Sequence, residues 1–550
     1  MSEAIAPGKG GSTRTARLLE SGPAPSILLL LLSLIIYKLG RKLLMGAVGL
    51  SQEHAFALVV AACIGAAAFV WVRYADFPRL LRVVLRGIGI VILIQVLFDA
   101  FGPVPPLPNI LFGDGPFTLL YRWGAVIALL AGAVSIWRPS FLVPLFFYYV
   151  AFRFLIGEAT GIAIVETDYL NFLDTGIFGI LGGLIVVTLT TPWGVRNVPG
   201  MRALTSESGP EVLRHRACNL IWACLVGAHL GNYFLSGVAK IEAGGNTPLI
   251  WWLQNPTQTS IVIGLERGDN PLALWPWAVQ TVWDAISGYG LIFNSFVFLA
   301  QILAPLAFLS LPALMVFTLL FDMFHIGVYL TLGALFHYWI LMNFIIYLSA
   351  FGMQRSELTM SMKVVGILAV LFGHYGFYTN RLGWLDGAKL ASPSFVAETR
   401  DGRLVPVPQV YWGIASYSIA QGWMYIPDGH FSFRIGGNNL NPEAWADATN
   451  CGPAIAESQD TGVRMEAVED LVRVSHRMMV ENPAIKEYNL YYWYPHHMVA
   501  HPWLFTEFNR LRIADIVGYR YVVESVCLSL RDGHLRRDVR KRTEVPIRVN

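Results

Sequence analysis

Four polar side chains in one apolar stretch could carry out acid–base chemistry. The stretch CNLIWACLVGAHLGNYFLSGVAKIEAGG places His229, Tyr233, Ser236 and Lys240 at i, i+4, i+7 and i+11, on one face of a helix. An amine that is buried among apolar side chains can lose its proton near neutral pH and act as a general base. The alternative for Lys240 is a lysine at a helix end that extends its amine to the lipid headgroups. The histidine, tyrosine and serine favour the functional interpretation, because such an extension needs none of them.

A second stretch repeats this arrangement. In LLFDMFHIGVYLTLGALFHYWILMNF, Asp322, His325 and Tyr329 are spaced i, i+3 and i+7 on one helix face. A carboxylate beside a histidine can fix its tautomer and raise its basicity, so we expect Asp322 to hold His325. The alternative is that these residues form hydrogen bonds that join neighbouring helices. If both stripes are functional, Lys240 and His325 face one cavity that opens toward the outer leaflet.

Both stretches resemble a known family. NYFLSGVAKIEAGG, the pair Trp251-Trp252 and FDMFHIGVYLTLGALFHYWILMN are similar to segments of the horizontally transferred transmembrane domain family, which contains vitamin K-dependent gamma-carboxylase. The resemblance implies that Lys240 is the general base and His325 a second catalytic residue. It also implies a reduced quinone as cofactor, a multispan membrane domain and a C-terminal domain outside the cytoplasm. The residues expected to support Lys240 and His325 are Asp322, His229, Tyr233, Ser236 and Tyr329.

One segment departs from the family. The carboxylases carry an Asn-Asn-His segment in an earlier loop, and the corresponding stretch here, ETDYLNFLDTG (166–176), has Asn171 and Asp174 but no histidine. Because this histidine takes part in carboxylation, its absence argues against carboxylation of glutamate. Oxidation of a bound quinol is then the expected reaction. The alternative function is non-catalytic, either a membrane transporter or an assembly subunit of a larger membrane complex. In that case the polar stripes line a pathway or join helices.

The composition places both stretches in a membrane. Apolar residues make up 55% of the 550-residue chain and charged residues only 14%, too few for the surface of water-soluble domains. A span needs about 20 mostly apolar residues, which predicts a polytopic all-α membrane protein with about eleven spans, in a range of about nine to twelve. The expected spans are 26–45, 54–72, 84–101, 119–137, 140–156, 174–192, 218–240, 289–310, 312–334, 335–351 and 362–378.

The distribution of basic residues predicts the orientation. Arginine collects in 73–88 and 193–217, and basic connections stay on the cytoplasmic side. We therefore expect a multi-pass protein of the inner (plasma) membrane, with a disordered cytoplasmic lead over 1–24 and a helical membrane domain over 25–378. With an odd number of spans, an extramembrane α+β domain over 380–550 lies outside the cytoplasm.

The segment 380–550 combines strand-like and helix-like patterns. Alternation of apolar and polar residues predicts strands over 403–411 and 519–530, whereas helical spacing predicts a helix over 463–480. The basic run RRDVRKR (536–542) is expected to be a solvated tail, and the alternative is a segment that binds anionic lipid headgroups.

The five cysteines form no metal-binding motif. Cys63, Cys218, Cys224, Cys451 and Cys527 include no CxxC pair and no zinc spacing. Outside the cytoplasm, Cys451 and Cys527 would lie in an oxidising compartment. They could form a disulfide there if their Cα atoms come within about 7 Å of each other.

No other group indicates a metal, haem or macromolecular partner. His496, His497 and His501 are weak metal candidates, because Pro495 and Pro502 interrupt the helix that their spacing would need. A net charge of +3 provides no basic surface for nucleic acid. The expected partners are therefore membrane lipid and a quinone, and no motif identifies a protein partner.

Overall fold

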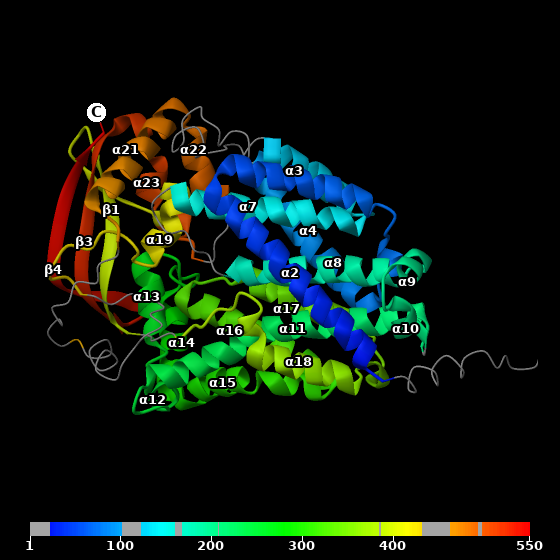
Figure 1. Ribbon diagram of the computed structural model, residues 1–550. Helices are drawn as coiled ribbons and strands as arrows, with labels where there is room; N and C mark the ends of the chain where they lie inside the picture. Colours follow the sequence, from blue (N-terminus) through cyan, green and yellow to red (C-terminus); the bar gives the residue numbers. More distant parts are fainter. Residues whose placement is uncertain are drawn as a thin grey trace, which may run out of the picture.

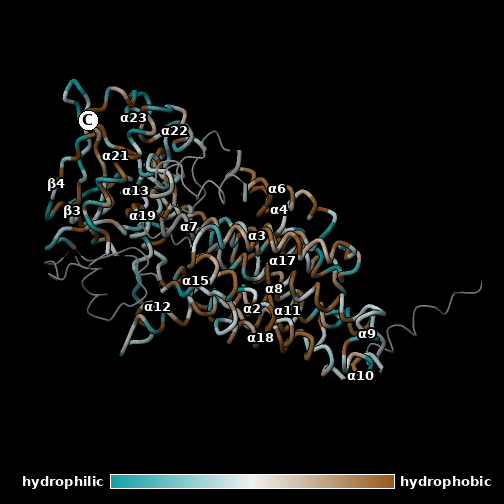
Figure 2. The backbone as a smooth tube through the Cα atoms, turned by 45° about the horizontal axis from the view of Figure 1, so that its top comes forward, coloured by the Kyte–Doolittle hydropathy of each residue, from teal (hydrophilic) through white to brown (hydrophobic). Residues whose placement is uncertain are grey.

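The chain is mostly helical and ends in a small antiparallel sheet, as the computed structural model in Figure 1 shows. Figure 2 shows that apolar residues dominate the helical part, whereas the sheet part mixes apolar and polar residues. The residues that the structure describes are 22–101, 123–159, 168–206, 208–383, 387–431, 451, 462–492 and 498–549.

The helical part consists of helices that follow one another closely along the chain. They are α2 (Ala24–Leu50), α3 (Gln52–Ala68), α4 (Arg79–Phe101), α6 (Ala125–Ser135), α7 (Leu142–Ala159), α8 (Asp168–Leu189), α9 (Pro192–Asn197), α10 (Met201–Ser206), α11 (Pro210–Ala243), α12 (Ile250–Gln254), α13 (Thr259–Arg267), α14 (Pro276–Gly288), α15 (Gly290–Ile302), α16 (Leu311–Leu332), α17 (His337–Ala350) and α18 (Met360–Phe372). Both views place α9 and α10 at the end of the helical part that is far from the sheet (Figures 1 and 2).

α11 is the central helix of this part. It begins with Pro210 and carries Glu211 in its first turn, and both residues are favourable at a helix N-terminus. Within the protein, 89% of its apolar segment is buried. Gly227 lets α18 approach closely, because a Cβ there would lie 2.5 Å from the carbonyl oxygen of Gly366. The polar stripe on α11 therefore faces protein rather than lipid.

The predicted count of eleven spans is not supported. Every predicted span overlaps a helical element, but among the described residues only four helices are long and apolar enough to cross a membrane. They are Arg79–Leu97, Asn171–Leu189, Pro210–Ala243 and Leu311–Leu332. α14 and α15, bent by 78° relative to each other, would make a fifth if they form one span. Several other stretches form apolar helices of 10–17 residues, shorter than the about 20 residues that a bilayer core needs.

α16 lies at the periphery of the helical part. Only 22% of its apolar segment is buried, in contrast to the central α11. Its N-terminus is capped by Ser310, whose hydroxyl accepts a hydrogen bond from the backbone of Ala313. It ends at Gly333, which has a φ of 80° and where a Cβ would lie 2.2 Å from the carbonyl oxygen of Asp269. α16 thus has one face toward the protein interior, which includes the buried His325, and one apolar face on the outer surface.

The sheet has four antiparallel strands in the order β2-β1-β3-β4. They are β1 (Lys389–Thr399), β2 (Leu404–Val407), β3 (Ile516–Arg531) and β4 (His534–Arg548), and the helices of this part are α19 (Ser416–Ala420), α21 (Met465–Glu481), α22 (Ala484–Glu487) and α23 (Thr506–Arg510). β3 and β4 form a hairpin whose turn, Asp532-Gly533, has positive φ at both positions, as a type I′ turn requires. Phe395, Trp412 and Tyr521 belong to the core of this part.

Two sequence-based elements of this part are found, and a third is shorter than predicted. The helix predicted over 463–480 corresponds to α21, and the strand predicted over 519–530 lies within β3. The strand predicted over 403–411 exists only as β2. Pro408 follows β2 and has no N–H to continue the ladder, and a 3₁₀ helix starts at Gln409.

The run 536–542 is exposed to solvent, as predicted, but it is part of a strand and not a tail. This run lies in β4 and pairs with β3, with a register shift at Arg540. The guanidinium groups of Arg537 and Arg542 both form ion pairs with Glu524 of β3. β4 is an edge strand, and a row of charged side chains protects such an edge from pairing with another chain.

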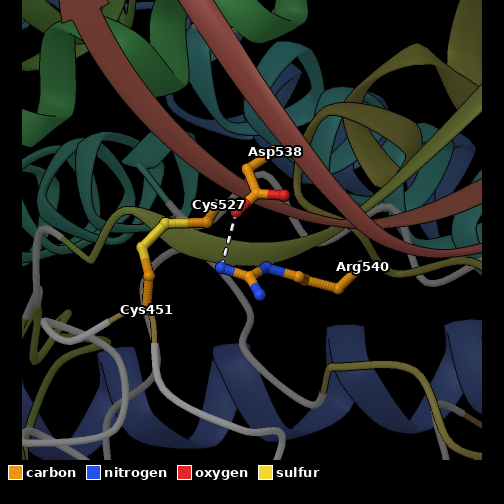
Figure 3. Close-up of a disulfide and its surroundings, with 4 residues drawn as sticks. All are labelled: Cys451, Cys527, Asp538 and Arg540. Atoms are coloured by element: carbon orange, nitrogen blue, oxygen red, sulfur yellow. Dashed lines mark ion pairs between the residues drawn. A yellow bond between two sulfur atoms is a disulfide. The ribbon is translucent and has the colours of Figure 1, made fainter.

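A disulfide joins Cys451 to Cys527 of β3, as Figure 3 shows. The two Cα atoms are 5.8 Å apart, within the range that a disulfide requires. Beside it, Asp538, the cross-strand neighbour of Cys527, forms an ion pair with Arg540. The sequence predicted this disulfide only as a possibility, and the structure contains it.

Thiol labelling should therefore distinguish two classes of cysteine. In denaturant without reductant, maleimide is expected to label Cys63, Cys218 and Cys224, which are free thiols, and to label all five cysteines after reduction. Mass spectrometry of the intact protein counts the labels. Cys451→Ser serves as the control, because it should expose one further thiol, that of Cys527. Five labels on the unreduced wild-type protein would contradict the disulfide.

The sheet part docks on the helical part at the end of α13. The guanidinium of Arg267 lies 2.8 Å from the carboxylate of Asp269 and donates a hydrogen bond of 2.9 Å to the carbonyl oxygen of Leu332 in α16. Its neighbour Glu266 accepts a hydrogen bond of 2.7 Å from Arg537 of β4. Burial raises the pKa of Asp269 to about 7, although the positive charge of Arg267 opposes this shift. The end of α13 therefore connects α16 to the sheet.

Candidate functional site

A cavity of about 490 Å³ lies between α11, α15, α16 and α17. Its walls are mostly aromatic and aliphatic. The lining residues are Ser236, Lys240, Trp251, Thr257, Ser260, Ile286, Ile292, Phe293, Phe296, Val297, Gln301, Met323, Phe324, His325, Gly327, Val328, Thr331, Leu332, Phe336, Trp339 and Leu382. Lys240 and His325, which the sequence suggested as partners, thus line one cavity.

The amine of Lys240 stays inside the protein. The side chain is only 3% exposed, and its Nζ donates hydrogen bonds to the carbonyl oxygens of Leu382 at 2.9 Å and Ser236 at 3.4 Å. It also lies 4.9 Å from the centre of the Trp251 ring. This geometry contradicts the alternative in which Lys240 extends to lipid headgroups.

Three other polar groups of the cavity wall have buried atoms without a partner among the described residues. They are Nδ1 of His325, Oε1 of Gln301 and Nε1 of Trp339. The His325 ring is held by aromatic contacts instead, with ring centres 5.6 Å from Tyr233 and 5.4 Å from Trp339. A buried polar atom without a hydrogen bond costs about 1–3 kcal/mol. Three residues that line one cavity therefore each keep a buried polar atom unsatisfied among the described residues.

Asp322 does not hold His325, and this prediction is wrong. Its carboxylate Oδ1 accepts a hydrogen bond of 2.9 Å from the Nδ2 of Asn343 in α17. Helical spacing places Asp322 and His325 near each other, but the short carboxylate turns toward the amide donor of the neighbouring helix. Asn343 also donates to the hydroxyl of Tyr233 at 2.8 Å. Asp322 is thus linked to α11 through Asn343 rather than to the histidine one turn away.

His229 and Tyr233 lie behind the cavity wall rather than in it. The two ring nitrogens of His229 lie 3.0 Å and 3.3 Å from the side-chain oxygens of Asn343 and Asn171. A neutral imidazole has one N–H and donates to only one of these two oxygens. The Tyr233 ring stacks on Phe321 with centres 3.7 Å apart. The contacts of His229 and Tyr233 reach α8, α16 and α17 from α11, which agrees with the alternative of interhelical connection for these two residues.

Of the two remaining predicted residues, Ser236 lines the cavity and Tyr329 does not. The hydroxyl of Ser236 accepts a hydrogen bond of 3.1 Å from the backbone of Leu382. This contact and the bond from Asn380 N to Asn232 Oδ1 at 2.7 Å hold the segment after α18 against α11, near Lys240.

The weak metal candidates remain without support. His496 and His497 lie outside the described residues. The His501 ring stacks on Trp503 with centres 4.3 Å apart, and burial lowers the pKa of His501. In the described part of the chain, no three His, Cys, Asp or Glu side chains are grouped as metal ligands.

Sequence reasoning missed Gln301, Trp339 and Asn343. A signal existed for Asn343 and Gln301, because each is an uncharged polar residue in an apolar helix, where polar groups are costly. Trp339 gave none, since an aromatic residue in a membrane protein is common.

Comparison with family models, with curated proteins and with solved structures finds no match to this chain.

Proposed function

We propose that this protein is a membrane enzyme that oxidises a lipid-soluble quinol, with Lys240 as general base and His325 as the second catalytic group. The observation that supports the proposal most directly is the apolar cavity that brings Lys240 together with the partnerless Nδ1 of His325. Gln301 and Trp339 add one acceptor and one donor to the same wall. A quinol ring, apolar on its faces and hydrogen-bonding at two opposite oxygens, matches this combination.

The reaction follows from these groups. Acting as a base in its neutral form, the amine of Lys240 takes the proton of one quinol hydroxyl, while Nδ1 of His325 accepts the hydrogen bond of the other. Deprotonation gives a quinolate, which releases electrons more readily than the quinol does. Two electrons and two protons pass to dioxygen, so that the quinol leaves as quinone and dioxygen as hydrogen peroxide. The chain supplies the base, the orientation of the ring and an environment that excludes water.

The same proposal includes the location at the outer face of the inner (plasma) membrane. Lys240 lies in the last turn of α11, whereas Arg214 and Arg216 lie near its beginning. Arg196 and Arg202 belong to α9 and α10, at the end of the helical part that is far from the sheet (Figure 1). If the arginine-rich end is cytoplasmic, the sheet and Lys240 lie toward the outer side. The disulfide of Cys451 and Cys527 is consistent with an oxidising compartment there.

The purified protein is expected to carry a quinone. Extraction of detergent-purified wild-type protein, followed by chromatography and mass spectrometry, should yield near-stoichiometric quinone. His325→Ala and Gln301→Leu each remove one hydrogen bond to the ring and should lower quinone retention about tenfold, the equivalent of about 1.4 kcal/mol. Tyr329→Phe is the matched control, since Tyr329 lies on α16 but outside the cavity wall. A wild-type protein that neither retains quinone nor oxidises added quinol would favour the transporter or assembly-subunit alternative.

A further inference from the structure

One wall of the cavity is also part of the outer surface of the helical part. Ile292 of α15 is 65% exposed and Met323 of α16 is 62% exposed, yet both line the cavity. Phe293 and Phe296 of α15 are likewise exposed on the outer surface and line the cavity. Large apolar side chains in contact with both the cavity and the surface mark an opening, and this opening lies between α15 and α16.

The space at this opening is not filled by other side chains. Gly327 of α16 lines the cavity, and no atom lies within 4 Å of the position that a Cβ would take there. Only 22% of the apolar segment of α16 is buried, as expected for a helix that faces lipid. The other side of the opening is formed by α15, which is bent by 78° relative to α14 and does not continue it as one straight helix. The opening is therefore bordered by the apolar outer surfaces of α15 and α16.

Polar groups are concentrated away from the opening. Lys240 and Gln301 are only 3% and 4% exposed, and His325 is 2% exposed. A ligand that fits both regions has a polar head for these three groups and an apolar tail for the surface between Ile292 and Met323. Because the tail would stay in contact with lipid, such a molecule never has to cross an aqueous phase.

We propose that the quinol enters this cavity sideways from the bilayer, between α15 and α16, and keeps its apolar tail in that opening during the reaction. The inference rests on the proposed function for the identity of the head group. It adds the route of entry and a requirement for a long alkyl or isoprenoid tail, which contacts Ile292, Phe296 and Met323.

Photo-crosslinking tests the position of the tail. A quinone whose alkyl tail carries a terminal diazirine is bound to the detergent-purified full-length protein and irradiated, and labelled peptides are identified by mass spectrometry. Labels on α15 and on the middle of α16 are expected, and they should disappear in the presence of excess unlabelled tailed quinone. Labels confined to other helices, or no labels that the competitor displaces, would overturn the proposal.

Filling the opening tests the route. Gly327→Trp places a large ring where the structure has space, and should lower both the labelling and the retained quinone at least tenfold. Gly65→Trp is the matched control, because Gly65 is also a helical glycine with open space and does not line the cavity. Gly327→Leu is the second variant if the tryptophan variant fails to give a monodisperse peak in size-exclusion chromatography. Unchanged labelling in the variant that folds would overturn sideways entry.

Failure of this inference and failure of the proposed function give different results. Lys240→Gln should keep the tail labels on α15 and α16 while losing quinol oxidation. If Lys240→Gln oxidises quinol at the wild-type rate and the labels remain, the base assignment fails and the route survives. If oxidation requires Lys240 but Gly327→Trp has no effect and the labels lie elsewhere, the route fails and the function survives.

Discussion

Lys240→Arg is expected to lose quinol oxidation by at least about 100-fold while the protein inserts and purifies normally. A general base must be able to exist in the neutral form, and a guanidinium stays protonated. The amine of Lys240 is positioned by the carbonyl oxygens of Ser236 and Leu382, which the planar guanidinium cannot contact in the same way. Lys240→Ala should lose activity to the same extent, because it removes the base altogether. Oxygen uptake and quinone absorbance with added quinol measure the rate.

Lys363→Arg is the matched control for this prediction. Lys363 lies on α18, outside the cavity, so its replacement should leave the rate unchanged. Size-exclusion profiles and retained quinone separate a catalytic loss from a folding defect. Wild-type activity in Lys240→Arg would show that the residue acts only as a positive charge or a hydrogen-bond donor.

Arg267→Ala is expected to destabilise the protein by about 3–5 kcal/mol, because it leaves the buried carboxylate of Asp269 without its counter-ion. The Arg267 and Asp269 side chains are only 7% and 0% exposed, so water does not replace the lost partner. Arg267 also donates to the carbonyl oxygens of Leu332 and Ala420, which belong to α16 and α19. The loss should therefore loosen the sheet part from the helical part. A thermal shift assay measures the loss of stability, and limited proteolysis reports the loosening.

The double variant Arg267→Met/Asp269→Leu controls for this effect. Replacing both charges by apolar groups removes the unpaired ion, so the double variant should be more stable than Arg267→Ala. A double variant as unstable as the single one would show that the hydrogen bonds to Leu332 and Ala420, rather than the ion pair, maintain the contact.

The same pair predicts a dependence of stability on pH. Burial raises the pKa of Asp269 from 3.8 to about 7, so the folded protein binds a proton more tightly than the unfolded chain. The corresponding stability is fully present below about pH 4 and is lost as the pH rises through about 7. Between pH 5 and pH 8 the midpoint of thermal unfolding should fall, and Asp269→Asn should reduce this fall. An identical fall in Asp269→Asn would assign the pH dependence to other groups.

The sequence by itself predicted apolar helices suited to a membrane and the polar residues that share one helix face. A charged fraction of 14% cannot cover the surface of water-soluble domains, and helical spacing puts His229, Tyr233, Ser236 and Lys240 on one face of a single helix. Both inferences depend only on composition and local periodicity. The helix α21 and the strand β3 followed from local pattern for the same reason.

The tertiary structure alone decided what these residues face. Gln301 and Trp339 join Lys240 and His325 only because α15 and α17 pack beside α11 and α16, and no spacing along the chain encodes that proximity. Asp322 contacts Asn343 instead of His325, since the donor on another helix competes with the neighbour one turn away. The basic run in β4 became a strand because Glu524 and the edge of β3 were available to it. Each outcome depends on which surfaces meet, and that is set by packing between elements distant in sequence.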